Sequence, residues 1–188
     1  MPSELRRAAF IDRDGVINVE SDHVGRPEDF HLLPHAIEGL RRLQAHGYAL
    51  VVVTNQAGIA KGLYTEDDYQ RVTRHMTDLL RSQQIRLDAV YHCPHHPLGT
   101  IRRFAIECDC RKPGPGMLLR AAAEMHLDLA SSVLVGDKIS DTAAGRAAGL
   151  RWTILVRSGH ALPEGYLSCA DYCCDDLSAA AAWVCSRD

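Results

Sequence analysis

The chain has 188 residues, 46% of them hydrophobic, which fits one domain over residues 1–188 with a sizeable buried core. Its formal net charge is -3 and its lysines and arginines form no long run, which argues against a general nucleic-acid-binding protein. Residues 1–7 lack the apolar stretch of a signal peptide, and no run of about 18 apolar residues occurs. We therefore expect a cytoplasmic protein without membrane contact, and a monomer, because nothing in the pattern indicates an obligate partner.

Predicted strands and helices alternate along the chain. The strands are predicted over residues 8–12, 48–53, 87–91, 131–135 and 153–156. The helices are predicted over residues 35–46, 66–82, 117–125, 139–148 and 177–184, and Thr65 and Asp68 can form a capping box at the start of the second. Residues 16–30, 54–63 and 92–115 are expected to be irregular, and the last of these is long for a loop without a function. The alternation predicts an α/β fold with a mostly parallel sheet flanked by helices.

Candidate functional residues follow the predicted strands or lie in the loops between elements. They are Asp12 and Asp14, Thr54 and Asn55, Arg111 and Lys112, and Asp137. Because ligands of open α/β folds bind outside the carboxyl ends of the strands, we expect these groups to meet on one rim. Alone, the Asp-x-Asp-Gly pattern at residues 12–15 fits a turn or a weak calcium-binding loop equally well.

The chemistry of these groups indicates a phosphate site with a metal ion. Asp12 and Asp137 supply the oxygen ligands that magnesium prefers, while Thr54 and the cations at 111 and 112 suit an anion such as phosphate. A carboxylate that attacks phosphorus must overcome repulsion from the phosphoryl oxygens, which magnesium and lysine would offset. Asp14 could then protonate the leaving group, provided that a nearby carboxylate raises its pKa.

The same residues resemble the four motifs of the haloacid dehalogenase superfamily of phosphatases. The motifs are Asp12-Arg13-Asp14-Gly15, Thr54-Asn55, Lys112, and Gly136-Asp137-Lys138 with Asp141. The resemblance implies a Rossmann-like, doubly wound fold. It makes Asp12 the nucleophile and Asp14 the general acid and base, with Thr54 and Lys112 holding the phosphoryl group. Magnesium would be bound by Asp12, the backbone carbonyl of Asp14, and Asp137.

Longer stretches resemble the family of D-glycero-D-manno-heptose 1,7-bisphosphate 7-phosphatases and the related histidinol-phosphatase domain. They are residues 53–60, 93–97, 108–113 and 135–138. The resemblance implies removal of the 7-phosphate from a small phosphorylated sugar through an aspartyl-phosphate, in the synthesis of nucleotide-activated heptose for lipopolysaccharide or another cell-surface glycan. It makes Arg111, Asn55, Gln56 and Lys138 substrate contacts. Residues 20–23, within the loop or flap expected over residues 16–30, match this family less well.

The spacing between motifs leaves no room for a large cap domain, so we expect an open site. Histidinol-phosphate hydrolysis on the same machinery is an alternative function. A domain that accepts and stores a phosphoryl group on Asp12 for signalling is a second alternative, against which Asp14 counts because such a domain needs no general acid.

Seven cysteines and no signal peptide argue against a disulfide framework. Cys93, His95, Cys108 and Cys110 lie in two close pairs across one loop, residues 92–111, and predict a closed, structural zinc site that holds the adjoining cations. His96 could replace His95, but the family resemblance implies His95. We expect ordinary thiols at the remaining cysteines, 169, 173, 174 and 185, and surface or packing roles for the histidines at 31, 35, 46, 75, 92, 126 and 160.

Overall fold

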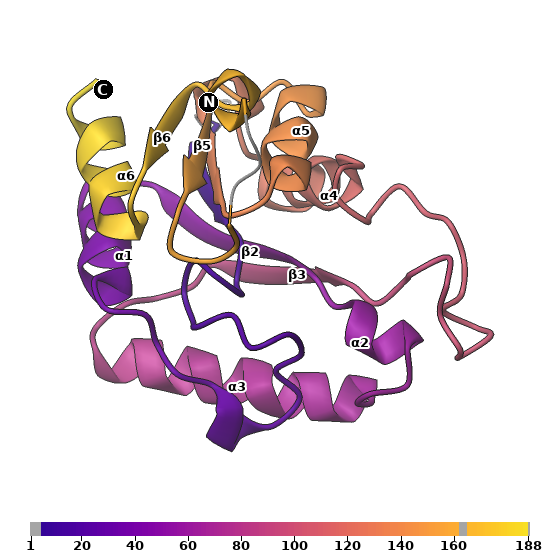
Figure 1. The fold of residues 1–188 in the computed structure, drawn as a ribbon. Coiled ribbons are helices and arrows are strands. Elements are labelled where there is room, and N and C mark those ends of the chain that lie inside the picture. The colour runs from indigo at the N-terminus through magenta and orange to yellow at the C-terminus, as the bar shows by residue number, and fades with distance from the viewer. Residues whose placement is uncertain (1–4, 162–164, 188) are drawn as a thin grey trace.

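A six-stranded parallel sheet forms the centre of the computed structural model, which describes residues 5–161 and 165–187 (Figure 1). The sheet order is β3-β2-β1-β4-β5-β6. The strands are β1 (Ala8–Ile11), β2 (Ala49–Asn55), β3 (Ala89–Cys93), β4 (Val133–Gly136), β5 (Trp152–Val156) and β6 (Tyr172–Cys174). All five pairs of neighbouring strands are parallel, so their carboxyl ends share one edge of the sheet.

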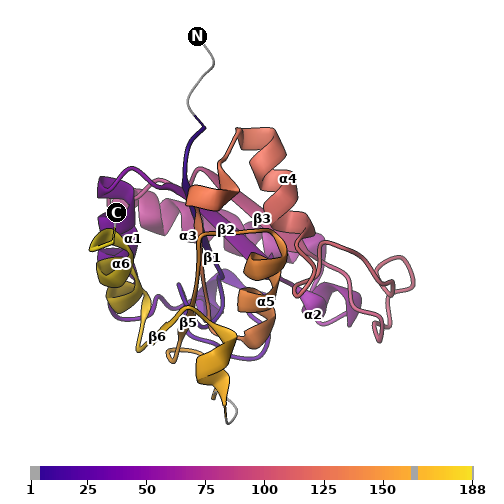
Figure 2. The ribbon, with the colours of Figure 1, turned by 90° about the horizontal axis from the view of Figure 1, so that it is seen from above.

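Helices cover both faces of this sheet, as the sequence predicts (Figure 2). One face packs against α1 (Ala36–Ala45), α3 (Glu66–Ser82) and α6 (Leu177–Cys185), and the other packs against α4 (Gly116–Met125) and α5 (Ile139–Ala147). Successive residues of β1 alternate between the two cores: Ala9 and Ile11 face the first, Ala8 and Phe10 the second. Both faces of the strand are therefore apolar, which is why a continuous apolar run specifies it.

The predicted strands and helices all occur, with ends shifted by a few residues. Two short elements were not predicted, the helix α2 (Ala57–Ala60) and the edge strand β6. Both are too short to show a periodicity. The part of the chain that the structure describes also contains three 3-10 helices that were not predicted: η1 (Pro27–Asp29), η2 (Leu129–Ser131) and η3 (Tyr166–Cys169). The capping box is confirmed, because Thr65 Oγ1 accepts from the Asp68 amide and Asp68 Oδ2 accepts from the Thr65 amide, at 3.1 and 2.7 Å.

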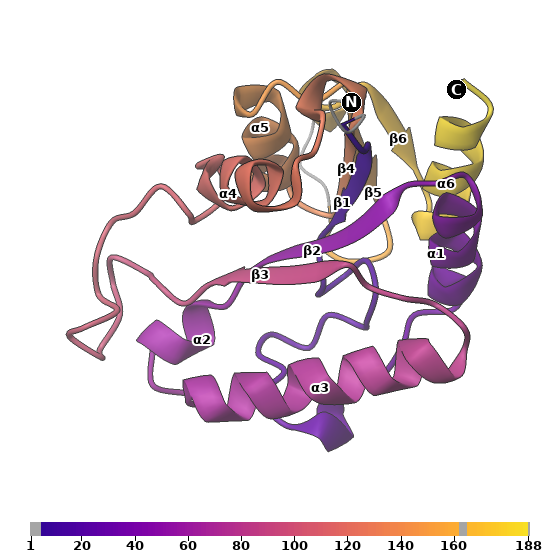
Figure 3. The same ribbon diagram turned by 180° about the vertical axis from the view of Figure 1, so that it is seen from behind.

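Two irregular segments flank the carboxyl edge of the sheet. The first is the flap, residues 16–30, which contains only η1. The second is the loop between β3 and α4, which contains no helix or strand and projects past α2 (Figure 3). Within the described ranges no helix is both long enough and apolar enough to cross a membrane.

Candidate active site

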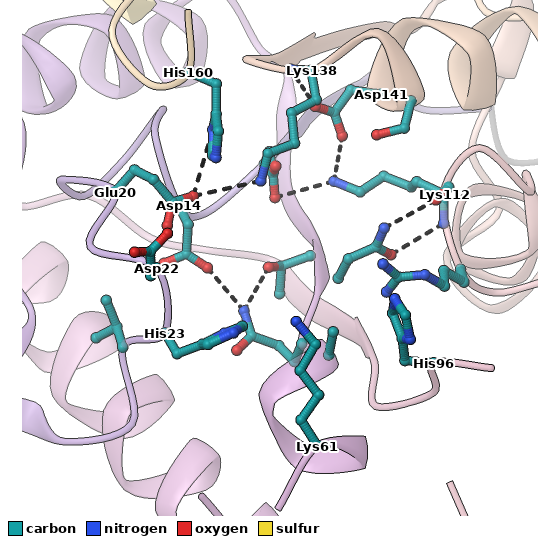
Figure 4. A pocket seen from close by; sticks show the side chains of 18 of the residues that line it. Asp14, Glu20, Asp22, His23, Lys61, His96, Lys112, Lys138, Asp141 and His160 are labelled. Carbon is teal, nitrogen blue, oxygen red and sulfur yellow. Dashed lines mark hydrogen bonds and ion pairs between the residues drawn. The ribbon is translucent and has the colours of Figure 1, made fainter. Parts of the chain in front are cut away.

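A cavity of about 480 Å³ opens at the carboxyl edge of the sheet (Figure 4). Groups from the ends of β1 and β2, from the flap, and from the loops after β3, β4 and β5 line it. They include Asp12, Asp14, Glu20, Thr54, Asn55, Gln56, Lys61, Arg111, Lys112, Lys138, Asp141 and His160. The structure therefore brings the groups predicted from the sequence to one rim, with Asp137 buried beside the cavity.

Lys112 lies at the centre of the charged network. Its Nζ lies 3.1 Å from Asp12 Oδ1 and 2.5 Å from Asp141 Oδ1, and it donates to the Val53 carbonyl at 2.8 Å. The lysine is 3% exposed. Burial lowers its pKa, but Asp12 and Asp141 together outweigh burial, so the pKa of Lys112 is raised and the side chain stays charged.

Asp12 follows the last residue of β1 and is 5% exposed. Burial raises the pKa of its carboxyl to about 7; Lys112 acts in the opposite direction, while Asp141, Asp137 and Asp14 add to the rise. A cation close to Asp12 would favour its charged, nucleophilic form.

The Asp14 carboxylate is bound by a different set of donors. Arg13 Nε and Nη2 bind its carboxylate at 2.9–3.2 Å, Asn18 Nδ2 donates at 3.0 Å, and Gln56 Nε2 donates at 2.9 Å. Burial alone would raise its pKa, but Arg13 and these hydrogen bonds lower it. The pKa of Asp14 is therefore lowered in this state, not raised as the role of general acid requires, because Arg13 and the hydrogen bonds from Asn18 and Gln56 together outweigh burial.

Thr54 and Asn55 are the last residues of β2, and Gln56 follows them. Gln56 Nε2 donates to Thr54 Oγ1 at 2.8 Å, and the Tyr64 hydroxyl donates to Gln56 Oε1 at 2.6 Å. The Asn55 amide binds the backbone of Lys112 twice: Nδ2 donates to its carbonyl at 3.0 Å, and Oδ1 accepts from its amide at 3.1 Å. Asn55 thereby fastens the loop that carries Lys112 to the end of β2.

The remaining predicted contacts lie at the mouth of the cavity. Arg111 lines it and donates from Nη1 to the His95 carbonyl at 3.3 Å. Lys138 Nζ lies 3.5 Å from Glu20 Oε2, so the flap touches the loop after β4. Figure 4 shows Glu20 and Asp22 on one side of the cavity and Lys61 and His96 on the other.

Asp137 has room and charge for a divalent cation. It is fully buried, and its Oδ1 has no hydrogen-bond partner. Carboxylate oxygens of Asp12, Asp137 and Asp141 lie within 4.8 Å of one another. Such a set of hard oxygen ligands around an unpaired buried oxygen fits magnesium.

The second oxygen of Asp137 contacts a residue that was not predicted to belong to the site. His160 Nδ1 lies 2.6 Å from Oδ2, and the His160 backbone amide donates to the same oxygen at 3.1 Å. The prediction of a surface or packing role for His160 was wrong. It follows β5 at the same edge of the sheet, so the rule that located Asp12 and Asp137 also applies to it.

Arg13, Glu20 and Tyr64 were also missed. Arg13 is fully buried, although it stands between two aspartates in the sequence. A charged residue inside an otherwise buried motif is the signal that could have identified it, because a buried guanidinium needs a paired partner. Glu20 and Tyr64 come from irregular segments, for which periodicity gives no orientation.

The predicted zinc ligands form a second cluster in the loop after β3. Cys93 Sγ lies 3.5 Å from Cys108 Sγ and 3.2 Å from Cys110 Sγ, and His95 Nδ1 lies 3.4 Å from Cys110 Sγ. Tetrahedral zinc with bonds of about 2.3 Å separates sulfurs by about 3.8 Å, so the four groups fit this metal closely. His96 lies outside the cluster and lines the cavity instead. Among the described residues, no candidate metal cluster contains any of the other four cysteines.

Comparisons with known proteins agree with this geometry. A family model described as HAD-hydrolase-like matches residues 109–180. The D-glycero-beta-D-manno-heptose-1,7-bisphosphate 7-phosphatase of Salmonella typhi is 43% identical over 171 residues, 91% of each chain. The crystal structure of D,D-heptose 1,7-bisphosphate phosphatase from B. bronchiseptica, complexed with magnesium and phosphate, superposes with a TM-score of 0.81 at 32% identity, covering 97% of this chain and 99% of that one.

A HAD-like phosphatase from Mesorhizobium loti gives a TM-score of 0.83 at 35% identity, covering 96% of this chain and 88% of that one. These similarities span almost the whole chain. The chain therefore belongs to the haloacid dehalogenase superfamily of hydrolases, in the family of the heptose bisphosphate phosphatases.

Proposed function

We propose that this protein removes the 7-phosphate of D-glycero-D-manno-heptose 1,7-bisphosphate in a magnesium-dependent reaction through an aspartyl-phosphate. One observation carries the proposal: the buried Asp12 carboxylate lies 3.1 Å from the Lys112 ammonium, and both line an open cavity with Asp14. The family relationship supports the substrate, because the relatives are named for it. Their names specify the beta anomer, so we propose that anomer here. The product would serve the synthesis of heptose-containing glycans such as lipopolysaccharide.

In the first step, an Asp12 carboxylate oxygen attacks phosphorus and the bond between phosphorus and the sugar oxygen breaks. Asp14 gives its proton to that oxygen, which leaves as the sugar hydroxyl. Arg13 keeps Asp14 ionised in the state described here, and a phosphoryl dianion in the cavity acts in the opposite direction and favours the protonated acid. In the second step, Asp14 removes a proton from water, the water oxygen bonds to phosphorus, and the Asp12 carboxylate is released.

The negative charge of the phosphoryl group would be neutralised by Lys112 and by the metal ion. Lys112 and Thr54 would hold the phosphoryl oxygens. The three acceptors that orient the Lys112 ammonium use all three of its N–H groups, so a phosphoryl oxygen would take the place of one of them. Magnesium would be held by Asp12, the backbone carbonyl of Asp14, and Asp137. When bound, it neutralises the charge of the phosphoryl group and of the attacking carboxylate.

The rest of the cavity would recognise the sugar and its second phosphate. Arg111, Asn55, Gln56 and Lys138 would be substrate contacts, as the resemblance implies. The Asn55 side-chain amide already bonds to the Lys112 backbone through both its nitrogen and its oxygen. Asn55 would therefore position Lys112 in addition to contacting the substrate.

The cysteine cluster would bind structural zinc. Four protein ligands leave no open position for a reacting molecule. Cys110 directly precedes Arg111 and Lys112 in the chain, so the metal would fix the segment that presents both cations. We also propose that the protein has one domain and is a cytoplasmic monomer. Light scattering after size-exclusion chromatography tests the oligomeric state.

The test is phosphate release from a panel of substrates with added magnesium. The panel contains the alpha and beta anomers of the heptose bisphosphate, histidinol phosphate and a generic phosphomonoester. We expect the highest kcat/KM for the beta bisphosphate. A clear preference for histidinol phosphate would overturn the proposed substrate, and a stable phosphoprotein that does not turn over would support the signalling alternative.

A further inference from the structure

The segment after β5 is folded closely around Asp137. Ser158 Oγ donates to the Gly15 carbonyl at 2.7 Å, which ties this segment to the turn after β1. A Cβ atom on Gly159 would lie 2.1 Å from Asp137 Oδ2, and one on Gly15 would lie 2.4 Å from the same oxygen. Real Cβ atoms essentially never approach that closely, so two glycines make room for the carboxylate. The backbone thereby brings the next residue, His160, directly against Asp137.

The backbone amide and the ring Nδ1 of His160 both contact the same oxygen of Asp137. The backbone amide and Nδ1 reach Oδ2 at 3.1 and 2.6 Å, while Oδ1 has no hydrogen-bond partner. When Asp137 is ionised, as a metal ligand is, it only accepts hydrogen bonds, and the contact then requires the tautomer of His160 with the proton on Nδ1. The two bonds fix the rotation of the carboxylate group and leave Oδ1 as the oxygen that a cation can use.

Glu20 is the other acidic group near the imidazole. Its Oε2 lies 3.7 Å from His160 Nδ1, beyond hydrogen-bond distance, and 3.5 Å from Lys138 Nζ. His160 is therefore bonded to Asp137 and only adjacent to the flap. Because Glu20 lines the cavity and lies close to Asp137 as well as to His160, it belongs to the site and does not serve as a control.

We propose that His160 is a positioning residue for the cation site: its imidazole orients the Asp137 carboxylate so that Oδ1 is presented to the metal ion. The inference rests on the magnesium-dependent function proposed above and adds to it a residue that the motifs do not include. Partners that orient a metal ligand contribute about 10–100-fold to metal affinity in proteins generally. The backbone amide of residue 160 would remain in any variant, so the imidazole accounts for only part of the orientation.

The experiment measures magnesium binding by isothermal titration calorimetry on the full chain without substrate, before any assay of turnover. His160→Ala should weaken the affinity for magnesium by about 10-fold or more. His160→Asn should restore most of that loss, because its side-chain amide can donate from nearly the place of Nδ1. His31→Ala, at an exposed histidine outside the cavity, is the control and should bind magnesium within about threefold of the unchanged protein. The His160 side chain is 39% exposed, so its truncation opens no closed cavity and should leave the fold intact.

Turnover supplies the second readout. In His160→Ala, the magnesium concentration for half-maximal rate should rise with the dissociation constant, while kcat at saturating magnesium stays within a few-fold. Equal affinities in His160→Ala and the unchanged protein would overturn the inference, and so would an Asn variant as weak as the Ala variant. Magnesium binding without phosphate release by the unchanged protein would instead refute the proposed function, and the comparison of dissociation constants would still decide the role of His160.

Discussion

Replacing Asn55 with alanine tests whether the loop that carries Lys112 is held by this side chain. The substitution removes two hydrogen bonds to the Lys112 backbone, of 3.0 and 3.1 Å. Each bond contributes about 0.5–1.5 kcal/mol net, and the loss lies toward the upper end where the abandoned groups are buried. Lys112 is 3% exposed, so we expect about 2–3 kcal/mol of lost stability in total. For a chain of this size that corresponds to a fall in Tm of about 4–12 °C.

The same change should reduce catalysis, because Lys112 and Arg111 leave their positions together. A displacement of about 1 Å can cost up to about 10²-fold, so we expect kcat/KM to fall by about 10–100-fold. Thermal unfolding followed by circular dichroism and steady-state phosphate release measure the two effects. Gln83→Ala, at an exposed amide after α3, is the control and should change neither. An Asn55→Ala protein with unchanged Tm and kcat/KM would refute the reasoning.

Three further predictions concern the chemistry and the second metal. Asp12→Asn should lower turnover by about 10³-fold or more, because the amide is a poor nucleophile; near-normal phosphate release would remove the mechanism. Asp14→Asn should lower kcat by about 10²–10⁴-fold through loss of the proton donor, and rapid-quench detection of a phosphoprotein would locate the slowed step. Cys108→Ser should lose zinc by elemental analysis and lower Tm, whereas Cys173→Ser, outside the cluster, should retain both. Full activity and stability in zinc-free Cys108→Ser would contradict the structural role.

The sequence predicted the sheet and the rim because both follow from simple rules. The alternating strands and helices required a parallel sheet, and the carboxyl ends of its strands had to share one edge. Asp12, Thr54 and Asp137 could therefore be placed together without knowing their distances. The cysteine cluster followed from ligand types and their spacing.

Which side chains of the site form hydrogen bonds or ion pairs with each other could not be predicted in the same way. Spacing put Asp14 beside Asp12, and only the fold shows that Arg13 turns inward and pairs with it. That the Asn55 amide also binds the backbone of Lys112, distant in the sequence, was not predicted. Such contacts depend on loop conformation and on which of several polar groups comes closest, which residue types alone do not determine.

The buried carboxylates of Asp12, Asp137 and Asp141 also affect the energetics of folding. Folding gathers three carboxyl groups within 4.8 Å of one another beside the Lys112 ammonium, while the unfolded chain keeps them apart in water. A cation that binds only the folded chain stabilises it by about 2.7 kcal/mol at a concentration of 100 times its Kd. Magnesium would therefore stabilise the folded chain against unfolding as well as take part in catalysis.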